Sequence, residues 1–429
     1  MNIKPAIVFL ILAAGLALLG LSCKHKATEP HDTTFALTAE DASCTEAWLK
    51  LQLGADLTDR TVTLTRDSIT LWTKAISDAQ ITILDTNLLP GHTYNYKAQT
   101  SGCLPSVAAV RTMDTTSHNF TWTTYTLGDG TGSSSLYDVA IINDTLAYAV
   151  GELYDGSSTS YCMSIWNGKE WQLKRLYYNS ISFGSLMLIH SIMGILATSD
   201  SIMWLVPGSI FRWNCNDTVA QISFDRLTLQ DQNASVIKLW GRSNDNIFGV
   251  GSAGTIVYSN GTSWQRLNSG TNTFINDVYG YLNDNNKNEV VFCAVSDFFQ
   301  PLDNKILQIN NLFSVDSIQW YQGKNVISLW TPDGSSLYVC SSSVYDNVKG
   351  YWREKSFGNY ANQIRGIARN DICAVGDNGL IACFNGVNWT PYYPFPNGSY
   401  NAVCIKKGII IAVGTTNDGK AIISIGKYY

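Results

Sequence analysis

The sequence predicts an all-β protein in which a small immunoglobulin-like β-sandwich is followed by a seven-bladed β-propeller. Three observations predict this fold class. Residues 35–117 alternate apolar and polar side chains with a period of two, which is the pattern of half-buried strands. The motif Asn-Gly-x-x-Trp occurs three times after residue 117. Hydrophobic strands that end in Val-Gly, or in a degenerate version of that pair, recur at residues 150, 206, 250, 295, 339, 375 and 413.

The composition supports packed sheets. The chain has 429 residues, of which 45% are hydrophobic, 12% aromatic and 15% charged. Typical globular proteins carry about 25% charged residues, so this composition excludes a disordered chain. The formal net charge is −5 and the sequence has no long basic run, which excludes nucleic acid as an expected partner.

Residues 1–22 have the pattern of a secretory signal peptide. Lys4 supplies a positive charge, residues 6–21 are uncharged and apolar, and Ser22 precedes Cys23. This segment resembles a bacterial lipoprotein signal, and the resemblance implies that Cys23 is lipidated. A plain signal peptide or an uncleaved anchor helix is the alternative, and either would leave Cys23 an ordinary thiol.

The lipoprotein resemblance also implies a location. Residues 23–34 are polar and contain Pro30, so they are expected to form a lipidated tether. Lys24 follows the cysteine where an aspartate would signal retention in the inner membrane of enteric bacteria. The resemblance therefore implies a protein of the bacterial cell envelope, anchored to the outer membrane on its periplasmic or surface side.

Residues 35–117 fit the seven short strands of an immunoglobulin-type sandwich. The run Leu88-Leu89-Pro90-Gly91-His92-Thr93-Tyr94 resembles the fibronectin type III motif Leu-x-Pro-Gly-x-x-Tyr, and Trp48 stands where that family keeps a core tryptophan. The resemblance implies a spacer or an adhesive module. The module has two cysteines, Cys44 and Cys103, which either pair in an oxidising compartment or remain buried free thiols.

The remaining residues, 119–429, contain the propeller repeats. A period of about 40 to 45 residues with four short strands per unit is typical of propellers. The third unit illustrates the pattern, with strands at 236–240, 246–250 and 255–258 and a fourth strand that opens at Trp264. Its Asn-Gly turn predicts a tight hairpin in which both turn residues take positive φ. Fourth-strand tryptophans are expected at Trp122, Trp171, Trp264, Trp320, Trp352 and Trp389.

The last unit lacks a fourth strand, because little chain follows the strand at 422–425. Residues 120–125 resemble the fourth strand at 263–267, so we expect strand 119–127 to complete the last blade and close the ring. Six or eight blades are the alternatives to seven. The repeat resembles bacterial propellers of the photosystem-assembly-factor and BNR-like type, although residues 259–264 lack the aspartate of a sialidase Asp-box.

Catalytic motifs are weak in this sequence, and we assign no catalytic residue, metal site or cofactor. Residues 249–254 match Gly-x-Gly-x-x-Gly, but a strand rather than a helix is expected to follow, which argues against nucleotide binding. His190 is the only histidine of the propeller and follows an apolar run, so we expect it to be packed. Cys373 and Cys383 flank a turn, where both a disulfide across a hairpin and two buried thiols remain open.

The sequence favours an envelope-anchored, non-enzymatic binding protein with the propeller as its recognition head and a protein or a glycan as its partner. A carbohydrate-active hydrolase or lyase on the central face is the alternative, and an assembly factor for an envelope complex is another. Loops that connect the second to the third strand, or one blade to the next, share one face of a propeller. Their rings are the candidate ligand-binding residues, unless they merely pack their own loops: Tyr154, Phe298, Phe299, Tyr345, Tyr360, Tyr392, Tyr393 and Tyr400.

Overall fold

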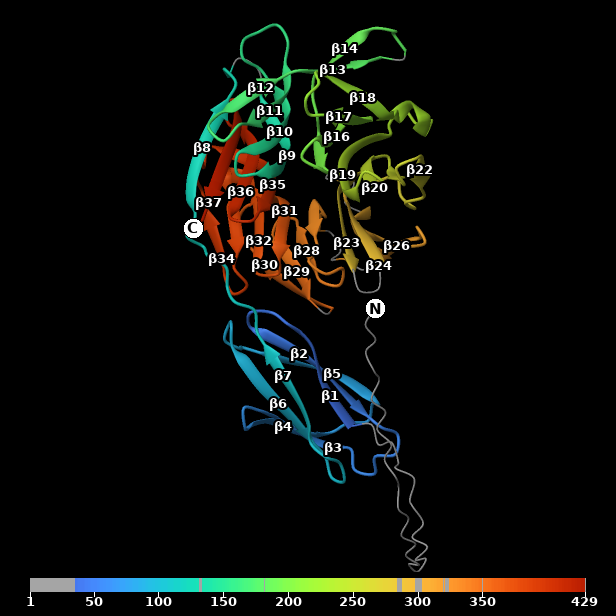
Figure 1. Cartoon of the computed structure of the whole chain (residues 1–429), viewed down its shortest axis with the longest axis vertical. Helices are drawn as coiled ribbons and strands as arrows, with labels where there is room; N and C mark the ends of the chain where they lie inside the picture. Colours follow the sequence, from blue (N-terminus) through green and yellow to red (C-terminus); the bar gives the residue numbers. More distant parts are fainter. Residues whose placement is uncertain are drawn as a thin grey trace, which may run out of the picture. The chain divides into compact units, whose positions relative to one another are not determined.

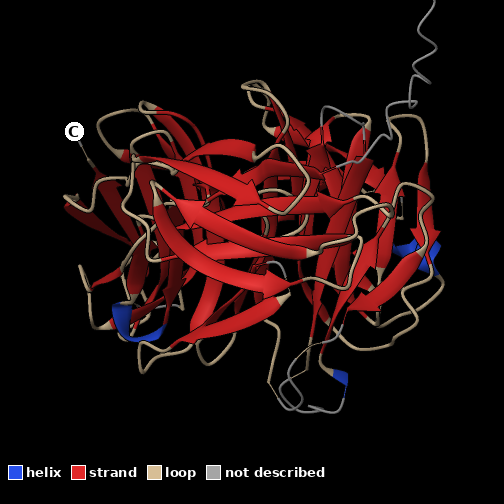
Figure 2. Ribbon diagram, turned by 90° about the horizontal axis from the view of Figure 1, so that it is seen from below, coloured by secondary structure: helices blue, strands red, loops and turns tan. Residues whose placement is uncertain are grey.

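The structure is a computed structural model that describes residues 35–130, 133–180, 182–283, 288–297, 303–318, 320, 324–348 and 350–428. The predicted signal peptide (1–22), the predicted tether (23–34) and Cys23 lie outside the described residues. Strands make up nearly all of the regular structure (Figure 2). Two short 3-10 helices are described, η1 (Arg226–Leu229) and η3 (Asp377–Gly379). In the described part of the chain, no helix has the length and apolar character needed to cross a membrane.

The first seven strands form two sheets. Strands β1, β2 and β5 make a three-stranded sheet, and the other four strands make a second sheet in the order β4-β3-β6-β7. The side chains of Trp48, Leu64 and Tyr96 are fully buried, in agreement with the alternating pattern of the sequence. The bounds are β1 (Phe35–Ala42), β2 (Glu46–Leu53), β3 (Thr61–Arg66), β4 (Ile69–Ala75), β5 (Gln80–Thr86), β6 (Thr93–Gln99) and β7 (Ser106–Arg111).

The chain divides into two compact units that interleave in sequence. Among the described residues, the first comprises residues 35–40 together with Trp48–Ile83 and Tyr94–Ala109. The second comprises Asp41–Ala47, Leu84–Thr93 and Val110–Tyr429.

Seven sheets follow one another along the second unit (Figure 1), and their strands pair antiparallel except where β13 pairs in parallel with β18. Six sheets have four strands, and one has six. The first sheet contains β9 (Ser135–Asn143), β10 (Leu146–Leu153), β11 (Tyr161–Trp166) and β12 (Trp171–Lys174). The second, six-stranded sheet contains β13 (Leu176–Asn179), β14 (Leu186–Ile189), β15 (Gly194–Ala197), β16 (Ile202–Val206), β17 (Ile210–Asn214) and β18 (Val219–Phe224). The third contains β19 (Ser235–Ser243), β20 (Asn246–Ser252), β21 (Ile256–Ser259) and β22 (Trp264–Leu267).

The next sheets contain β23 (Ile275–Asn283), β24 (Asn288–Val295), β25 (Lys305–Ile309) and β26 (Val315–Ile318); β27 (Ser328–Trp330), β28 (Leu337–Cys340), β29 (Val344–Val348) and β30 (Tyr351–Lys355); and β31 (Ala361–Ala368), β32 (Asp371–Gly376), β33 (Ile381–Phe384) and β34 (Trp389–Tyr392). The last sheet combines β35 (Gly398–Lys406), β36 (Ile409–Thr416) and β37 (Ala421–Lys427) with β8 (Thr121–Leu127). The predicted strands of the third unit thus match β19 to β22. Trp320, however, follows β26 instead of opening a fourth strand.

The first strands of the sheets contact one another in a closed cycle, from β9 through β15, β19, β23, β27, β31 and β35 back to β9. Polar side chains on these strands bond to the next sheet: the side chains of Asp138, Asp277 and Gln363 accept the backbone N–H of Ile195, Leu329 and Val403 at 3.2, 3.2 and 2.7 Å. Apolar side chains fill the space between sheets, as where Val150 and Met163 of one sheet cluster with Leu205 and Trp213 of the next.

The repeated Val-Gly pair has a steric cause. A Cβ atom added at Gly151, Gly251, Gly376 or Gly414 would lie 1.9 to 2.0 Å from a backbone carbonyl oxygen of the neighbouring first strand or of the residue just before it. The register shifts at this point in each pair of strands, which is a β-bulge. Only glycine allows the two backbones to approach so closely.

The Asn-Gly turns differ from the expectation in one detail. Gly168, Gly261 and Gly386 take positive φ, but the asparagines before them do not. The Asn167 Oδ1 instead accepts the N–H groups of Lys169 and Glu170, and the other two asparagines repeat this pattern. Asparagine therefore favours these turns through its side-chain hydrogen bonds.

Strand β8 completes the last sheet. It pairs with β37 over seven residues, from Ala421 opposite Leu127 to Lys427 opposite Thr121. The hydroxyl groups of Thr124 and Ser424 hydrogen-bond across this pair at 2.7 Å. A segment that precedes the first sheet in sequence thus forms the outer strand of the final one.

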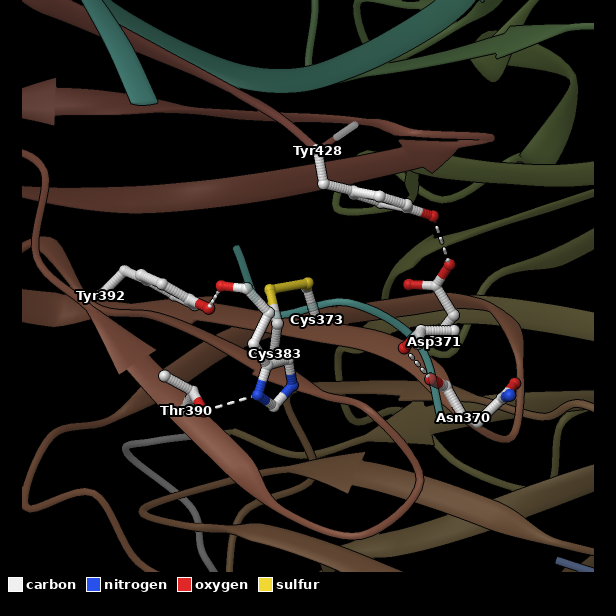
Figure 3. The surroundings of a disulfide bond; sticks show 9 residues. Asn370, Asp371, Cys373, Cys383, Thr390, Tyr392 and Tyr428 are labelled. Carbon is white, nitrogen blue, oxygen red and sulfur yellow. Dashed lines mark hydrogen bonds between the residues drawn. A yellow bond between two sulfur atoms is a disulfide. The ribbon is translucent and has the colours of Figure 1, made fainter. Parts of the chain in front are cut away.

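The structure also resolves the alternatives for the cysteines. Cys373 and Cys383 lie opposite each other on β32 and β33 and form a disulfide (Figure 3). Cys44 and Cys103 are free thiols, so the pairing considered for them is absent. Direct opposition across a tight hairpin is what allowed the first pair to bond, since a disulfide requires closely spaced Cβ atoms.

Candidate functional pocket

The six-stranded sheet contains a hairpin that the other sheets lack. Strands β13 and β14 are inserted between β12 and β15, and β13 pairs in parallel with β18 through Tyr177 and Tyr178. Figure 1 shows β13 between β14 and β18. The insertion therefore adds two strands to the outer edge of this sheet.

A pocket of about 520 Å³ lies under this hairpin. Its lining comes from the hairpin, from the connection between β16 and β17 and from the segment after β18. These connections belong to the face predicted to carry recognition loops. The lining residues are Tyr178, Ser180, Ser182, Phe183, Leu188, Ile189, His190, Ser191, Pro207, Ser209, Phe211, Ile222, Asp225, Arg226 and Leu227.

Large apolar side chains around the pocket are open to solvent. Two of the lining residues, Phe183 and Leu227, are 76% and 66% exposed. Leu186 of β14 is not part of the lining, but it is 54% exposed on the same hairpin. Tyr178 packs edge-on against Phe211 with ring centroids 5.2 Å apart, which gives the pocket a rigid aromatic wall. Isolated exposed apolar residues are common, but a group of them around a concave site is typical of a binding surface.

Charged and polar groups lie at the same site. The Asp225 carboxylate accepts the N–H of Leu227 at 3.1 Å and so caps η1, while Ser209 Oγ accepts the N–H of Arg226 at 3.1 Å. The Arg226 side chain is exposed, and its described contact is a long hydrogen bond of 3.5 Å to the Gln232 carbonyl. This guanidinium is therefore available to an anionic group of a ligand.

His190 is exposed, so the expectation that it is packed was wrong. Its Nδ1 lies 3.3 Å from Ser160 Oγ, and that hydroxyl also contacts the His190 carbonyl. A Ser-His catalytic site needs a third group that orients the imidazole. Among the described residues, no carboxylate hydrogen-bonds to His190, so this contact does not form a triad.

Carboxylates on the first strands are held in ion pairs. Asp277 is buried and binds Arg365 at 2.8 Å, and Asp138 binds Lys238 at 3.0 Å. Burial alone would raise the pKa of Asp277, but the charge and hydrogen bonds of Arg365 outweigh it and hold the pKa below its usual range. A general acid of a glycosidase needs a raised pKa, so Asp277 is unsuited to that role.

The glycine motif and the titratable side chains were also compared with the sites that nucleotides and metal ions need. Residues 249–252 are the end of β20 and residues 253–254 belong to the turn before β21, so a strand follows this glycine motif, as expected. Between residues 35 and 428, gaps aside, no group of three or more His, Cys, Asp or Glu side chains is arranged to hold a metal ion.

The structure places the predicted ligand-binding rings in different surroundings, and two of them in the core. Tyr345 and Tyr400 were expected on surface loops, but they lie in β29 and β35 with side chains that are almost completely buried. The strands begin earlier than the sequence pattern indicated, and both rings fill the cores between sheets. These two residues are therefore corrected to core positions.

Tyr392 is also engaged within the protein. Its hydroxyl donates to the His118 carbonyl at 2.5 Å, and its ring meets Phe120 edge-on with centroids 5.7 Å apart. The His118 ring contacts Thr390 Oγ1 at 2.7 Å, so the segment before β8 covers side chains of the edge strand β34. Figure 3 labels Thr390 and Tyr392 of that strand. Tyr392 is part of that cover.

The remaining candidates do not gather into one site. Tyr360 and Tyr393 are 46% and 45% exposed, and Tyr154 is half-buried with its hydroxyl bonded to Glu152. Phe298 and Phe299 lie outside the described residues. Sequence reasoning missed the pocket itself, although one signal pointed to it. The interval from residue 150 to residue 206 is the longest between repeats, and the hairpin accounts for it.

Comparisons with known proteins show the fold. No family model matches the chain, and no curated protein matches it. A solved structure of YCF48 bound to a D1 peptide is similar with a TM-score of 0.53 and 11% identity, over 73% of this chain and 98% of that one. The WD40 β-propeller domain of Doa1 is similar with a TM-score of 0.52 and 14% identity, over 73% of this chain and 98% of that one.

A third similar structure is an enzyme. It is an inactive variant of virginiamycin B lyase from Staphylococcus aureus with quinupristin, with a TM-score of 0.52 and 10% identity, over 72% of this chain and all of that one. Together these neighbours define the class of the molecule, which is an all-β protein with a β-propeller. At such low identity they define nothing finer than the fold.

Proposed function

We propose that this protein is a non-enzymatic binding protein in which the propeller is the recognition head and the pocket under β13–β14 is its binding site. The observation that carries the proposal is the group of exposed apolar side chains around that pocket, with Phe183 at 76% exposure. Aromatic and aliphatic anchors that enter a desolvated pocket supply most of the energy of protein recognition. The partner proposed is therefore a protein segment.

A peptide fits the site better than a glycan does. The lining has polar side chains, but Ser209 Oγ and the Asp225 carboxylate already accept backbone N–H groups of η1. The exposed apolar side chains Phe183 and Leu227 favour the apolar residues of a peptide over the hydroxyl groups of a sugar. One structural neighbour, YCF48, was solved with a peptide bound, which shows that the fold can present such a site. An assembly factor for an envelope complex would use the same kind of contact.

The hydrolase or lyase alternative lacks a supporting group of residues. The similar lyase fold makes such an activity conceivable for a propeller in general. In the described part of this chain, however, Asp138 and Asp277 are neutralised by Lys238 and Arg365, and His190 has no carboxylate partner. We therefore propose binding rather than catalysis.

The proposal also covers the arrangement of the sheets into domains. We propose that the seven sheets are the blades of a closed seven-bladed propeller, which the cyclic contacts of the first strands support. We also propose that β1 to β7 form a fibronectin type III-like sandwich that acts as a spacer, supported by the sheet orders β1-β2-β5 and β4-β3-β6-β7 and by buried Trp48.

The proposal further places the protein at the bacterial cell envelope through a lipid on Cys23, by its sequence resemblance to lipoprotein signals. The variant Cys23→Ser should then move the protein from the membrane fraction to the soluble fraction. Unchanged fractionation, together with an unchanged mass when lipoprotein signal peptidase is inhibited, would overturn the anchor.

Binding at the pocket can be tested with a library of random ten-residue peptides displayed on phage. Peptides selected on the wild-type protein should lose at least tenfold in affinity for the double variant Phe183→Ala, Leu227→Ala. The matched control is Leu312→Ala, because Leu312 is 87% exposed on the turn between β25 and β26, away from the pocket. Failure to select any peptide, or equal affinity for both variants, would overturn the proposed site.

A further inference from the structure

Strand β14 forms an open edge of the six-stranded sheet. The sheet order ends with β14, which pairs with β13 from Leu186 opposite Asn179 to Ile189 opposite Leu176. Within the described residues, no other strand pairs with it. An open edge presents backbone N–H and C=O groups to any extended chain that approaches.

The direction of these backbone groups follows from the ladder. Ser180 N donates to Ser185 O at 3.0 Å, which makes these two residues a hydrogen-bonded pair. Antiparallel ladders alternate bonded and non-bonded pairs, so Tyr178 and Met187 form the next bonded pair. Tyr177 confirms the alternation, because its N–H points the other way and donates to Thr218 O at 2.9 Å. The N–H and C=O groups of Leu186 and Leu188 therefore face the open edge.

The composition of β14 differs from that of every other outer strand. The other sheets end in strands with a charge or a proline, namely β12 (Lys174), β22 (Arg266), β26 (Asp316), β30 (Arg353, Glu354 and Lys355) and β34 (Pro391), or in the threonine-rich β8. Such residues protect an edge against pairing. Strand β14 reads Leu-Met-Leu-Ile and has no such protection. An unprotected edge beside a pocket favours a partner that pairs with it.

We propose that β14 binds an extended segment of a partner protein by β-strand addition, so that the segment becomes the next strand of this sheet. This inference rests on the proposed function and specifies its partner. Hydrogen bonds to Leu186 and Leu188 fix the backbone of the segment, and alternate side chains enter the pocket beside Leu188 and Phe183. The exposed Arg226 selects a segment that carries a carboxylate near its apolar residues.

The segment is required to be extended and free of proline at the pairing positions. A helix could fill the pocket but would leave the N–H and C=O groups of Leu186 and Leu188 unsatisfied by the partner. A second copy of this chain that pairs through β14 is the competing occupant, and it would appear as a dimer. The test therefore has to separate backbone pairing from side-chain contact and from self-association.

The first measurement uses one peptide selected from the library, with single backbone amides replaced by esters. An ester removes one N–H donor and leaves the side chains in place. Strand addition predicts a loss of about threefold to tenfold at alternate positions and little change between them, because alternate groups face β14. An even profile along the peptide would overturn strand addition while leaving the proposed pocket intact.

The second measurement follows amide exchange in the full protein. In the free protein, the amides of Leu186 and Leu188 should exchange rapidly, while that of Met187 is protected by β13. Saturating peptide should slow Leu186 and Leu188 by at least tenfold. Unchanged exchange at both residues, with the peptide bound and sensitive to Phe183→Ala, would overturn this inference but not the proposed function.

Matched variants complete the test. Leu186→Thr keeps the backbone N–H, whereas Leu186→Pro removes an N–H that makes no bond within the protein. Strand addition predicts at least tenfold weaker peptide binding for the proline variant and less than threefold for threonine. Equal losses would assign the contact to the side chain. If proline disrupts the hairpin, seen as lost Met187 protection, the ester series on the wild type decides. A concentration-dependent dimer that Leu186→Pro abolishes, with no peptide bound, would assign the edge to a second copy and overturn the proposal.

Discussion

Two edge strands of the second unit, β34 and β14, differ in whether other residues cover them. The edge at β34 contains Pro391 and is covered by the segment before β8, with Tyr392 bonded to His118 and packed on Phe120. The edge at β14 has no proline and, within the described residues, pairs with no further strand; its Leu186 and Met187 side chains are exposed, whereas Ile189 is buried. Both regions are rich in aromatic and aliphatic residues. The comparison teaches that a segment rich in aromatic or aliphatic side chains is not by that alone a recognition surface. These side chains are exposed only where no other part of the chain packs over them.

The largest effect is expected inside the closed region. Tyr400 is fully buried, its hydroxyl is hydrogen-bonded to Ser424, and burial raises its pKa to about 12. Tyr400→Ala should lower the free energy of unfolding by about 3–5 kcal/mol, because it leaves a cavity between sheets. Tyr393→Ala is the matched control and should change it by less than about 0.5 kcal/mol. Urea unfolding measures both, and a stable Tyr400→Ala variant would break the distinction between core and surface tyrosines.

The disulfide should contribute the next largest effect. The double variant Cys373→Ala, Cys383→Ala should lower the free energy of unfolding by about 2–3 kcal/mol, because the bond restricts a loop in the unfolded chain. A reducing agent should destabilise the wild type by a similar amount and leave the double variant unaffected. Reductant sensitivity that persists in the double variant would exclude this bond as the cause.

The cover over β34 should respond to pH. Burial lowers the pKa of His118 below its ordinary value of 6.5. The unfolded chain therefore binds a proton at a higher pH than the folded chain does, and stability falls as the pH drops from 7 through the lowered pKa. His118→Gln should make the midpoint of thermal unfolding depend less on pH between 7 and 5. Parallel pH curves for the two proteins would show that His118 does not set this dependence.

The smallest effect on stability is expected at the open edge. The double variant Leu186→Thr, Met187→Thr should change the free energy of unfolding by less than about 0.5 kcal/mol, because both side chains are exposed and threonine favours strands. Urea unfolding of this variant beside the wild type measures the difference. A large loss of stability would mean that the hairpin depends on these side chains, and the contrast with β34 would then be weaker.

Much of the fold could be predicted because short sequence motifs determine its bulges and turns. The repeated Val-Gly pairs mark positions where Gly151 and its equivalents meet a backbone carbonyl, and the Asn-Gly turns bond through their own side chains. Both are short-range effects that leave a trace in the sequence. The similarity between residues 120–125 and 263–267 likewise indicated a strand, which the structure pairs with β37.

The site was harder to predict, because exposure depends on residues far away in the sequence. Tyr400 lies just before a bulge and is covered by another sheet, which its local sequence does not reveal. Likewise, the apolar run Leu186–Ile189 resembles a core strand, and only the sheet order shows that it is an edge. The long interval between repeats could have indicated an insertion, but not its pairing with β18.

The closure by β8 also has a consequence for biosynthesis. Thr124 and Ser424 are separated by 300 residues, yet they hydrogen-bond in the finished sheet. At about 5–20 residues per second, the ribosome completes β37 roughly 15–60 seconds after β8. Until then β8 has no β37 to pair with, and contacts between neighbouring residues cannot replace that pairing. Strand β8 therefore stays without its native partner until β37 has been made, so this blade can form only late in synthesis.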